Sequence, residues 1–177
     1  MLRMLAVLCL VISSLSHSEQ IESITGAKTV DAYMAMKLFE EGATFIDVRD
    51  QFEFQLGHIR SAVHLDLKRD FNDLYLIETL DKNIPIVIYC NSAHCYRSAV
   101  ATFLAVSWGY ENVHYFKDGY FTWLALDLPV VMDNSQMSHE ADRVADSSWQ
   151  RQMKSALAEV QLAKANGFHP INGAIAQ

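Results

Sequence analysis

The sequence predicts an α/β domain whose mostly parallel sheet is flanked by helices, with an extra C-terminal amphipathic helix. Two observations support this prediction. Short apolar segments typical of buried strands alternate with segments of helical periodicity, which is the pattern of βα units. In such units the helices cover both faces of the sheet, so the strands are buried. With 177 residues and 51% hydrophobic residues, the chain is large enough to bury one good core.

The first half of the chain is expected to begin with a loose polar leader at 19–28. Apolar residues at helical spacing then predict a helix that Gly42 closes, and Gly57 stops a second, shorter one. Between them, an apolar run ending in charge predicts a buried strand. The expected elements are a helix over 30–39, a strand over 44–48, a short helix over 50–56 and a strand over 62–67.

The second half is expected to continue the alternation. Gly109 ends its Ala-rich helix, and a polar turn precedes its longest apolar run. The expected elements are a helix over 71–80, a turn over 81–83, a strand over 84–89, a helix over 98–108, a strand over 112–116 and a short helix over 121–126 before 128–131.

After about Asp133 the chain becomes polar, and residues 141–165 then have the periodicity of a long amphipathic helix. The predicted apolar stripe consists of Val144, Trp149, Met153, Leu157 and Val160, and the charged residues Arg151, Lys154 and Glu159 lie outside it. We expect this helix, within a C-terminal extension over 134–177, to pack onto the domain's own surface. A helix that binds a protein partner or a second copy is the alternative.

Residues 1–18 have the features of a cleavable signal peptide: a charged start, an apolar centre and a zone of small residues. The apolar centre is too short to span a bilayer, which needs about 20 residues. We therefore expect export, most simply to a periplasm, with an uncleaved anchor as the alternative. The net charge is −7. Such an acidic chain argues against nucleic acid or an anionic membrane as a partner.

Cys90 is the leading candidate for chemistry. It follows the apolar run 84–89, and a small polar loop and a helical pattern come directly after it. A strand, a tight loop and a helix N-terminus together form an anion-binding geometry, because unpaired backbone N–H groups point into the loop. The same amides and the helix dipole favour a thiolate. Asp47 also ends a predicted strand, so two strand ends are expected to face one site.

Three segments of the sequence resemble the rhodanese-like domain, the sulfurtransferase superfamily, over residues 28–131. They are the stretch 47–62, the strand and loop 86–99, and the stretch 109–130, which includes Asp118-Gly119-Tyr120 and Leu128-Pro129. The resemblance implies a compact α/β sheet domain. It also implies that Cys90 is the sulfur-carrying nucleophile, which removes a sulfur atom from a small anion such as thiosulfate and becomes a persulfide. A thiophilic acceptor, such as a thiol, then takes the sulfur.

The resemblance also assigns roles to the residues that follow Cys90. The backbone N–H groups that would bind the substrate belong to Asn91, Ser92, Ala93, His94, Cys95 and Tyr96. Arg97 would add positive charge for the departing anion. Asp47, Arg49 and His58 would support the loop structurally, with a general-base role for His58 as a minor alternative. The implied reaction needs no cofactor and no metal, and His94 beside two cysteines lacks the second ligand pair of a zinc site.

The loop departs from the commonest family pattern. That pattern has six residues, an internal glycine and an Arg directly after the cysteine, whereas this loop has Asn91 there, no glycine and two extra residues before Arg97. It resembles a subgroup, many of them exported, whose loop holds two cysteines followed by an aromatic residue. Activity on thiosulfate is therefore not assumed.

Cys95 has three open interpretations: a resolving thiol for Cys90, a disulfide partner of Cys90, or a small residue at the helix start. It is also a second candidate for the nucleophile, because it lies nearer the helix N-terminus. The cysteine pair leaves a thiol–disulfide or redox protein as an alternative function, and a non-catalytic binding module as another. A phosphatase or arsenate reductase is disfavoured, because six residues rather than five separate Cys90 from Arg97.

Overall fold

The structure is a computed structural model that describes residues 20–132 and 147–167. The expected signal peptide at 1–18 lies outside the described residues, as does the first part of the predicted 141–165 helix. Within the described residues, no helix is both long and apolar enough to cross a membrane.

A five-stranded parallel sheet forms the centre of the domain, in the order β1-β6-β5-β2-β4. Its strands are β1 (Lys28–Val30), β2 (Thr44–Asp47), β4 (Val63–His64), β5 (Ile86–Tyr89) and β6 (Val113–Phe116). A separate antiparallel pair consists of β3 (His58–Ile59) and β7 (Val130–Val131). The predicted parallel sheet is confirmed, and β5 lies at its middle.

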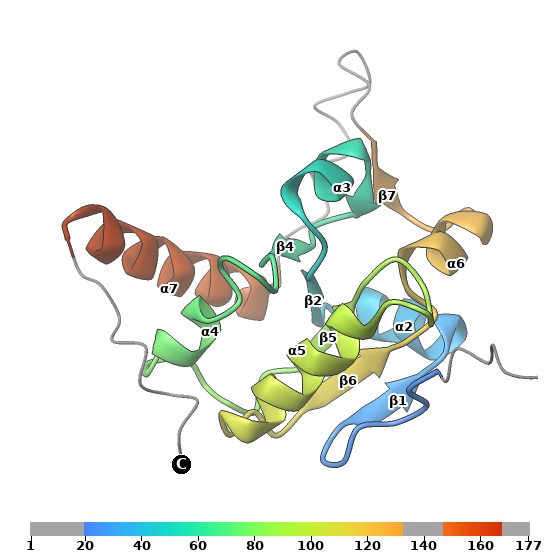
Figure 1. The fold of residues 1–177 in the computed structure, drawn as a ribbon, viewed down its shortest axis with the longest axis horizontal. Coiled ribbons are helices and arrows are strands. Elements are labelled where there is room, and N and C mark those ends of the chain that lie inside the picture. Colours follow the sequence, from blue (N-terminus) through green and yellow to red (C-terminus); the bar gives the residue numbers. More distant parts are fainter. Residues whose placement is uncertain (1–19, 133–146, 168–177) are drawn as a thin grey trace, which may run out of the picture.

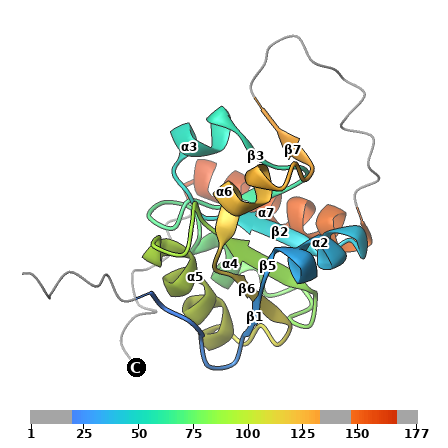
Figure 2. The ribbon, with the colours of Figure 1, turned by 90° about the vertical axis from the view of Figure 1, so that its right-hand side faces the viewer.

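Helices cover both faces of this sheet (Figures 1 and 2). They are α2 (Ala32–Glu40), α3 (Gln51–Leu56), α4 (Asp73–Leu76), α5 (Tyr96–Ser107), α6 (Gly119–Ala125) and α7 (Ser148–Ala165). Strand β5 shows the two-sided burial, because successive side chains of a strand point to opposite faces. Ile86 and Ile88 pack into the core beneath α4, α5 and α7, whereas Val87 and Tyr89 pack beneath α2 and α6.

Some predicted elements are corrected by the structure. Residues 28–30 form the edge strand β1 rather than the end of a loose leader and the start of a helix; the strand is exposed at its first two residues, so its sequence lacks an apolar run. The helix expected over 71–80 is the single turn α4, because the backbone becomes extended at Ile77 and the helix ends there. Leu80 still reaches the core, but from a loop.

Helix α7 packs onto the domain's own surface through Met153, Ala156 and Leu157. The predicted stripe is wrong at Trp149, which is 37% exposed, and the neighbouring Gln150 is buried instead. Polar contacts fix both ends of the helix. The Ser147 hydroxyl donates to the Gly42 carbonyl at 2.7 Å, and Lys164 pairs with the buried carboxylate of Asp73.

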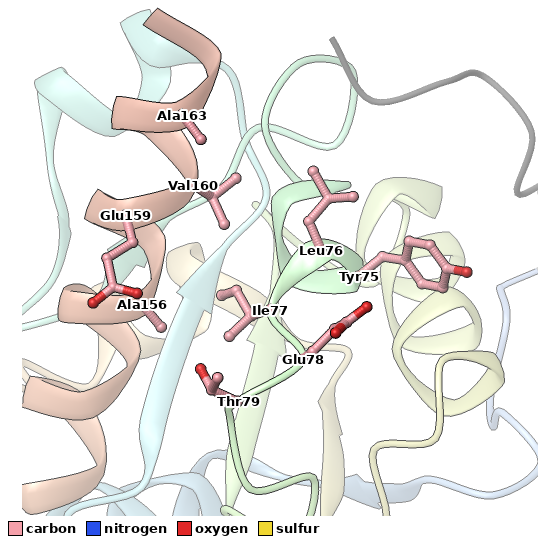
Figure 3. Close-up of a pocket in the computed structure, with 9 residues that line it drawn as sticks. All are labelled: Tyr75, Leu76, Ile77, Glu78, Thr79, Ala156, Glu159, Val160 and Ala163. Carbon is pink, nitrogen blue, oxygen red and sulfur yellow. The ribbon is translucent and has the colours of Figure 1, made fainter. Parts of the chain in front are cut away.

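A groove of about 560 Å³ runs between α7 and the segment 75–79. Side chains of Val160 and Ile77 point toward one another across it (Figure 3). This groove lies on the α4 and α7 side of the sheet, and its lining includes neither cysteine nor any residue of the 91–97 loop.

Candidate functional site

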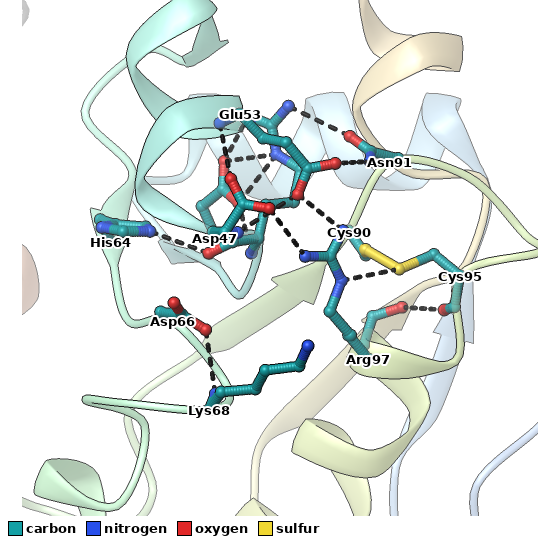
Figure 4. A network of polar contacts seen from close by, with 12 residues as sticks. Asp47, Glu53, His64, Asp66, Lys68, Cys90, Asn91, Cys95 and Arg97 are labelled. Carbon is teal, nitrogen blue, oxygen red and sulfur yellow. Dashed lines mark hydrogen bonds and ion pairs between the residues drawn. A yellow bond between two sulfur atoms is a disulfide. The ribbon is translucent and has the colours of Figure 1, made fainter.

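The carboxyl ends of β2 and β5 meet at one edge of the sheet. The two strands are parallel neighbours, and their register places Asp47 beside Tyr89, the residue before Cys90. A hydrogen bond joins the two strand ends, since Arg49 Nη1 donates to Asn91 Oδ1 at 3.2 Å. The tertiary structure therefore brings together the two segments that the sequence placed at one site (Figure 4).

Arg49 is held in a buried position by several partners. Its Nη2 donates to Asp47 Oδ2 at 2.6 Å and to the Gly57 carbonyl at 2.6 Å, and Nε donates to Asp47 Oδ1 at 2.9 Å. The guanidinium carbon also lies 4.2 Å from the ring centroid of Tyr120. Burial alone would lower the pKa of Arg49, but the hydrogen bonds and charge of Asp47 outweigh it and raise the pKa. The Arg49 guanidinium is therefore charged, and its hydrogen bonds fix its position.

The two cysteines of the loop form a disulfide. The Cα atoms of Cys90 and Cys95 lie 6.2 Å apart, within the usual range of about 4.4–6.8 Å. Cys90 is only 1% exposed, whereas Cys95 is half-buried. Of the three interpretations of Cys95, the structure contains the disulfide. Helix α5 begins earlier than predicted, so Cys95 is its N-cap residue, and its side chain makes no capping hydrogen bond.

The first turn of α6 fixes the orientation of the loop backbone. Tyr120 N donates to the Cys90 carbonyl at 2.8 Å, and Phe121 N donates to the Asn91 carbonyl at 3.0 Å. Because C=O and N–H point in opposite directions across a trans peptide, the N–H groups of Asn91 and Ser92 point away from α6. This orientation is what an anion cradle on the other side of the loop requires.

Gly119 permits this close approach. Its φ is +67°, and a Cβ atom there would lie 2.4 Å from the Cys90 carbonyl oxygen. Any other residue would have an unfavourable backbone conformation, and its Cβ atom would clash with the Cys90 carbonyl. The sequence contains Gly119 in a segment that resembles the family, but the loop contact that requires a glycine appears only in the folded chain.

Arg97 faces carboxylates rather than an open site. Its Nη2 lies 2.7 Å from Glu53 Oε2, and its Nη1 lies 3.7 Å from Asp50 Oδ2. Its Nε donates to Cys95 Sγ at 3.4 Å. The pKa of Asp50 is lowered, first by the backbone N–H of Glu53 and further by Arg97. The positive charge expected for a departing anion is therefore shared with two acidic groups.

Glu53 is a site residue that the sequence interpretation missed. It belongs to a capping box at the start of α3, where Asp50 accepts from Glu53 N and the Glu53 carboxylate accepts from Asp50 N. The same carboxylate accepts from the Asn91 side-chain amide and pairs with Arg97. An acidic residue three positions after Asp50 is a visible sequence signal for the cap, but not for its contacts with the cysteine loop.

The other expected site residues take peripheral places. Ser92 accepts from Cys95 N through its carbonyl at 2.9 Å, and Tyr96 is exposed. His94 is exposed, and its Nε2 lies 3.0 Å from Gln20 Nε2. His58 lies 3.0 Å from the Phe54 carbonyl through Nδ1, and burial lowers its pKa. Ala93, between Ser92 and His94, is half-buried in the same loop.

Within residues 20–132 and 147–167, no group of three or more His, Cys, Asp or Glu side chains is arranged to hold a metal ion. The site contains two cysteines joined by a disulfide and a loop whose backbone amides are oriented by α6. Charged side chains from α3 and α5 lie beside them. These parts suit cysteine chemistry on a small anion.

Relatives with known names share this domain. A protein named thiosulfate sulfurtransferase GlpE, from Haemophilus influenzae, is 34% identical over 103 residues, which is 58% of this chain and 93% of that protein. A protein of Pseudomonas savastanoi with the same name is 34% identical over 102 residues, which is 58% of this chain and 92% of that protein.

Solved structures agree with this match. The crystal structure of the Alr3790 protein from Anabaena sp. has a TM-score of 0.51 and 26% identity, covering 61% of this chain and 96% of that one. The polysulfide-sulfur transferase homodimer from Wolinella succinogenes has a TM-score of 0.51 and 26% identity, covering 64% and 85%. The family model described as rhodanese-like domain matches residues 31–126, and the chain therefore belongs to the rhodanese-like domain family.

Proposed function

We propose that the protein is a sulfurtransferase that forms a persulfide on Cys90 and passes the sulfur to a thiophilic acceptor. The observation that carries the proposal is the position of Cys90. It lies at the carboxyl end of the central strand β5, before the N-terminus of α5, in a chain that covers nearly the whole length of relatives named thiosulfate sulfurtransferase.

The reaction begins from the reduced loop. The Cys90 thiolate attacks the outer sulfur of a donor such as thiosulfate, the S–S bond of the donor breaks, and sulfite leaves with the bonding electron pair. The N–H groups of Asn91 and Ser92 point away from α6, so they are available to the developing negative charge. Arg97 can stabilise the departing sulfite when its ion pairs with Glu53 and Asp50 open.

The test uses protein reduced and then freed of reductant. Incubation with thiosulfate is expected to release sulfite from the wild type. In Cys95→Ser, which removes the disulfide partner and retains Cys90, intact-mass analysis should show one added sulfur atom on Cys90. The matched variant Cys90→Ser should release no sulfite and gain no sulfur. Sulfite release that persists in Cys90→Ser would contradict the assignment of the nucleophile.

We also propose the domain boundaries and location that the sequence indicates: a signal peptide at 1–18, the rhodanese-like domain at 28–131, a C-terminal extension at 134–177, and export to a periplasm. The charged start and short apolar centre of the first residues support export. Expression of the full chain, followed by cell fractionation and N-terminal sequencing of the product, tests it. A product that retains Met1 and stays in the cytoplasm would contradict export.

A second function is favoured by one specific observation, the Cys90–Cys95 disulfide. A thiol–disulfide protein would exchange this bond with a partner thiol and would need no sulfur donor. Oxidation of one equivalent of a dithiol substrate by the oxidised protein, with reduction of the Cys90–Cys95 disulfide and without thiosulfate or sulfite release, would favour this second function over the first.

A further inference from the structure

The disulfide joins the proposed nucleophile to a second thiol of the same loop. As long as the bond exists, the Cys90 sulfur cannot attack a donor, because the thiolate is the reactive form. A transferase that passes sulfur only to outside acceptors has no use for such a bond. The bond has a direct chemical source, however, if Cys95 takes part in the reaction after the sulfur has reached Cys90.

We propose that Cys95 resolves the persulfide of Cys90, so that the protein reduces sulfane sulfur to hydrosulfide and ends each turnover in the disulfide that the structure contains. This inference rests on the proposed sulfurtransferase function, because the persulfide must form first. It adds an activity to that function: a net reduction by two electrons, rather than transfer of sulfur to another molecule.

The balance of the two steps is complete. In the first, the Cys90 thiolate and thiosulfate give the Cys90 persulfide and sulfite. In the second, the Cys95 thiolate attacks the inner sulfur, Cys90 Sγ. The bond between the two sulfur atoms of the persulfide breaks, and the protonated outer sulfur leaves as hydrosulfide with the electron pair. The two cysteines are oxidised to the disulfide, and the sulfane sulfur is reduced.

The geometry favours Cys95 over an outside acceptor. The disulfide demonstrates that Cys95 Sγ reaches bonding distance of Cys90 Sγ within this loop, so the attack is intramolecular. An outside acceptor attacks the outer sulfur of the persulfide instead, and because Cys90 is only 1% exposed, a bulky acceptor has poor access to a sulfur carried there. An internal thiol has no such obstacle.

The charges around Cys95 favour its thiolate. Arg97 Nε lies 3.4 Å from Cys95 Sγ, and Cys95 is the N-cap residue of α5, where the helix dipole stabilises negative charge. Arg97 thus has a second role besides the departing anion. It stabilises the attacking sulfur of Cys95.

The cycle needs a reductant, which we assign to the class of dithiols. A dithiol reaches the half-buried Cys95 sulfur more easily than the buried Cys90 sulfur. It forms a mixed disulfide with Cys95 and releases the Cys90 thiolate. Its second thiol then frees Cys95, and the reductant leaves as its own disulfide.

The experiment is a single turnover without oxygen. Full-length protein is reduced, freed of reductant and mixed with an excess of thiosulfate; sulfite, hydrosulfide and intact mass are then measured. The wild type is expected to release one sulfite and one hydrosulfide per chain and to lose two hydrogen atoms in mass. The Cys95→Ser variant is expected to release one sulfite, retain one added sulfur atom and release no hydrosulfide.

The outcomes separate the two proposals. If the wild type releases sulfite but keeps the added sulfur and releases no hydrosulfide, the inference is overturned and the transferase proposal stands. If neither protein releases sulfite, the transferase proposal itself fails. Equal hydrosulfide release by the wild type and Cys95→Ser would also overturn the inference, because Cys95 would then be dispensable. Circular dichroism of Cys95→Ser verifies that the variant is folded.

Discussion

Arg49 and Arg97 both lie near the Cys90 loop, and their surroundings differ. Arg49 is 2% exposed and is held by the buried carboxylate of Asp47, by the Gly57 carbonyl and by the ring of Tyr120. The Arg97 side chain is 17% exposed, and it pairs with Glu53 and with the half-exposed Asp50. The first arginine binds β2 to the loop, and the second borders the cysteines.

The difference shows how one site combines a fixed part and an adjustable part. A buried ion pair is costly to break, because it leaves an uncompensated charge away from water. An ion pair with solvent access contributes little to folding and exchanges partners easily. We therefore expect Arg49 to control stability and Arg97 to control the reaction with anions.

The largest effect is expected for Arg49→Ala. Asp47 is fully buried, so the variant leaves its carboxylate without its main partner, and we expect a loss of about 3–5 kcal/mol in the free energy of unfolding. Urea denaturation measures it. The control Arg49→Lys keeps the charge without the two-pronged geometry and should lose less. A loss below about 1 kcal/mol in Arg49→Ala would remove the distinction between the two arginines.

Arg97→Ala should change the reaction rate much more than the stability. We expect a change of less than about 1 kcal/mol in the free energy of unfolding, because the ion pairs have solvent access. The rate of sulfite release should nevertheless fall by about 10²-fold, as when one group that stabilises developing charge is removed. Urea denaturation and single-turnover kinetics on the same preparation give both numbers. A large stability loss with an unchanged rate would reverse the assignment.

Glu53→Gln tests the acidic partner of Arg97. The amide can still accept from the Asp50 backbone N–H, but it no longer neutralises Arg97. We expect the KM for thiosulfate to fall by about two- to fivefold, the size of one exposed charge interaction. Steady-state kinetics at low and high salt measures it, and the difference should shrink as salt screens the charges. An increase in KM would indicate that Glu53 orients Arg97 rather than competing for it.

The smallest effect concerns pH and the histidines. Burial lowers the pKa of His58 and of His114 in the folded chain. The unfolded chain therefore takes up protons first as the pH falls below about 6.5, and the folded state loses stability there; above that pH both states are neutral and stability is retained. Urea denaturation between pH 7.5 and 5.5 should show this decline, and His58→Gln should make it shallower. A pH-independent midpoint would contradict the shifts.

Local patterns predicted most of the fold. The apolar run before Cys90, the polar loop and the Ala-rich helix predicted a strand, a turn and a helix, and β5 and α5 are present with small shifts at their ends. The signals that failed were weak for physical reasons. Strand β1 has only one buried residue, and β3 and β7 are two residues each. None of these strands is therefore long enough to show the alternation of apolar and polar residues that identifies a strand.

The candidate site was predicted in part. Cys90 and Asp47 were identified because they stand at the ends of strands, where parallel sheets place their ligands, and Arg49 was identified through the resemblance to the family. Glu53 and Gly119 were not assigned to the site. Their importance comes from contacts with residues far away in sequence, namely Glu53 with Arg97 and Gly119 with the Cys90 carbonyl.

The sequence by itself determined the chemistry on offer: a thiol after an apolar strand, a second thiol before a helix, and the periodicity that makes strands and helices where they are. These are short-range properties, set by side-chain spacing within each segment. Only the tertiary structure decided which charges meet. The order of β6, β5 and β2 in the sheet places α3 and the turn of α6 beside the loop, so that Glu53 faces Arg97 and the amides of Asn91 and Ser92 point away from α6.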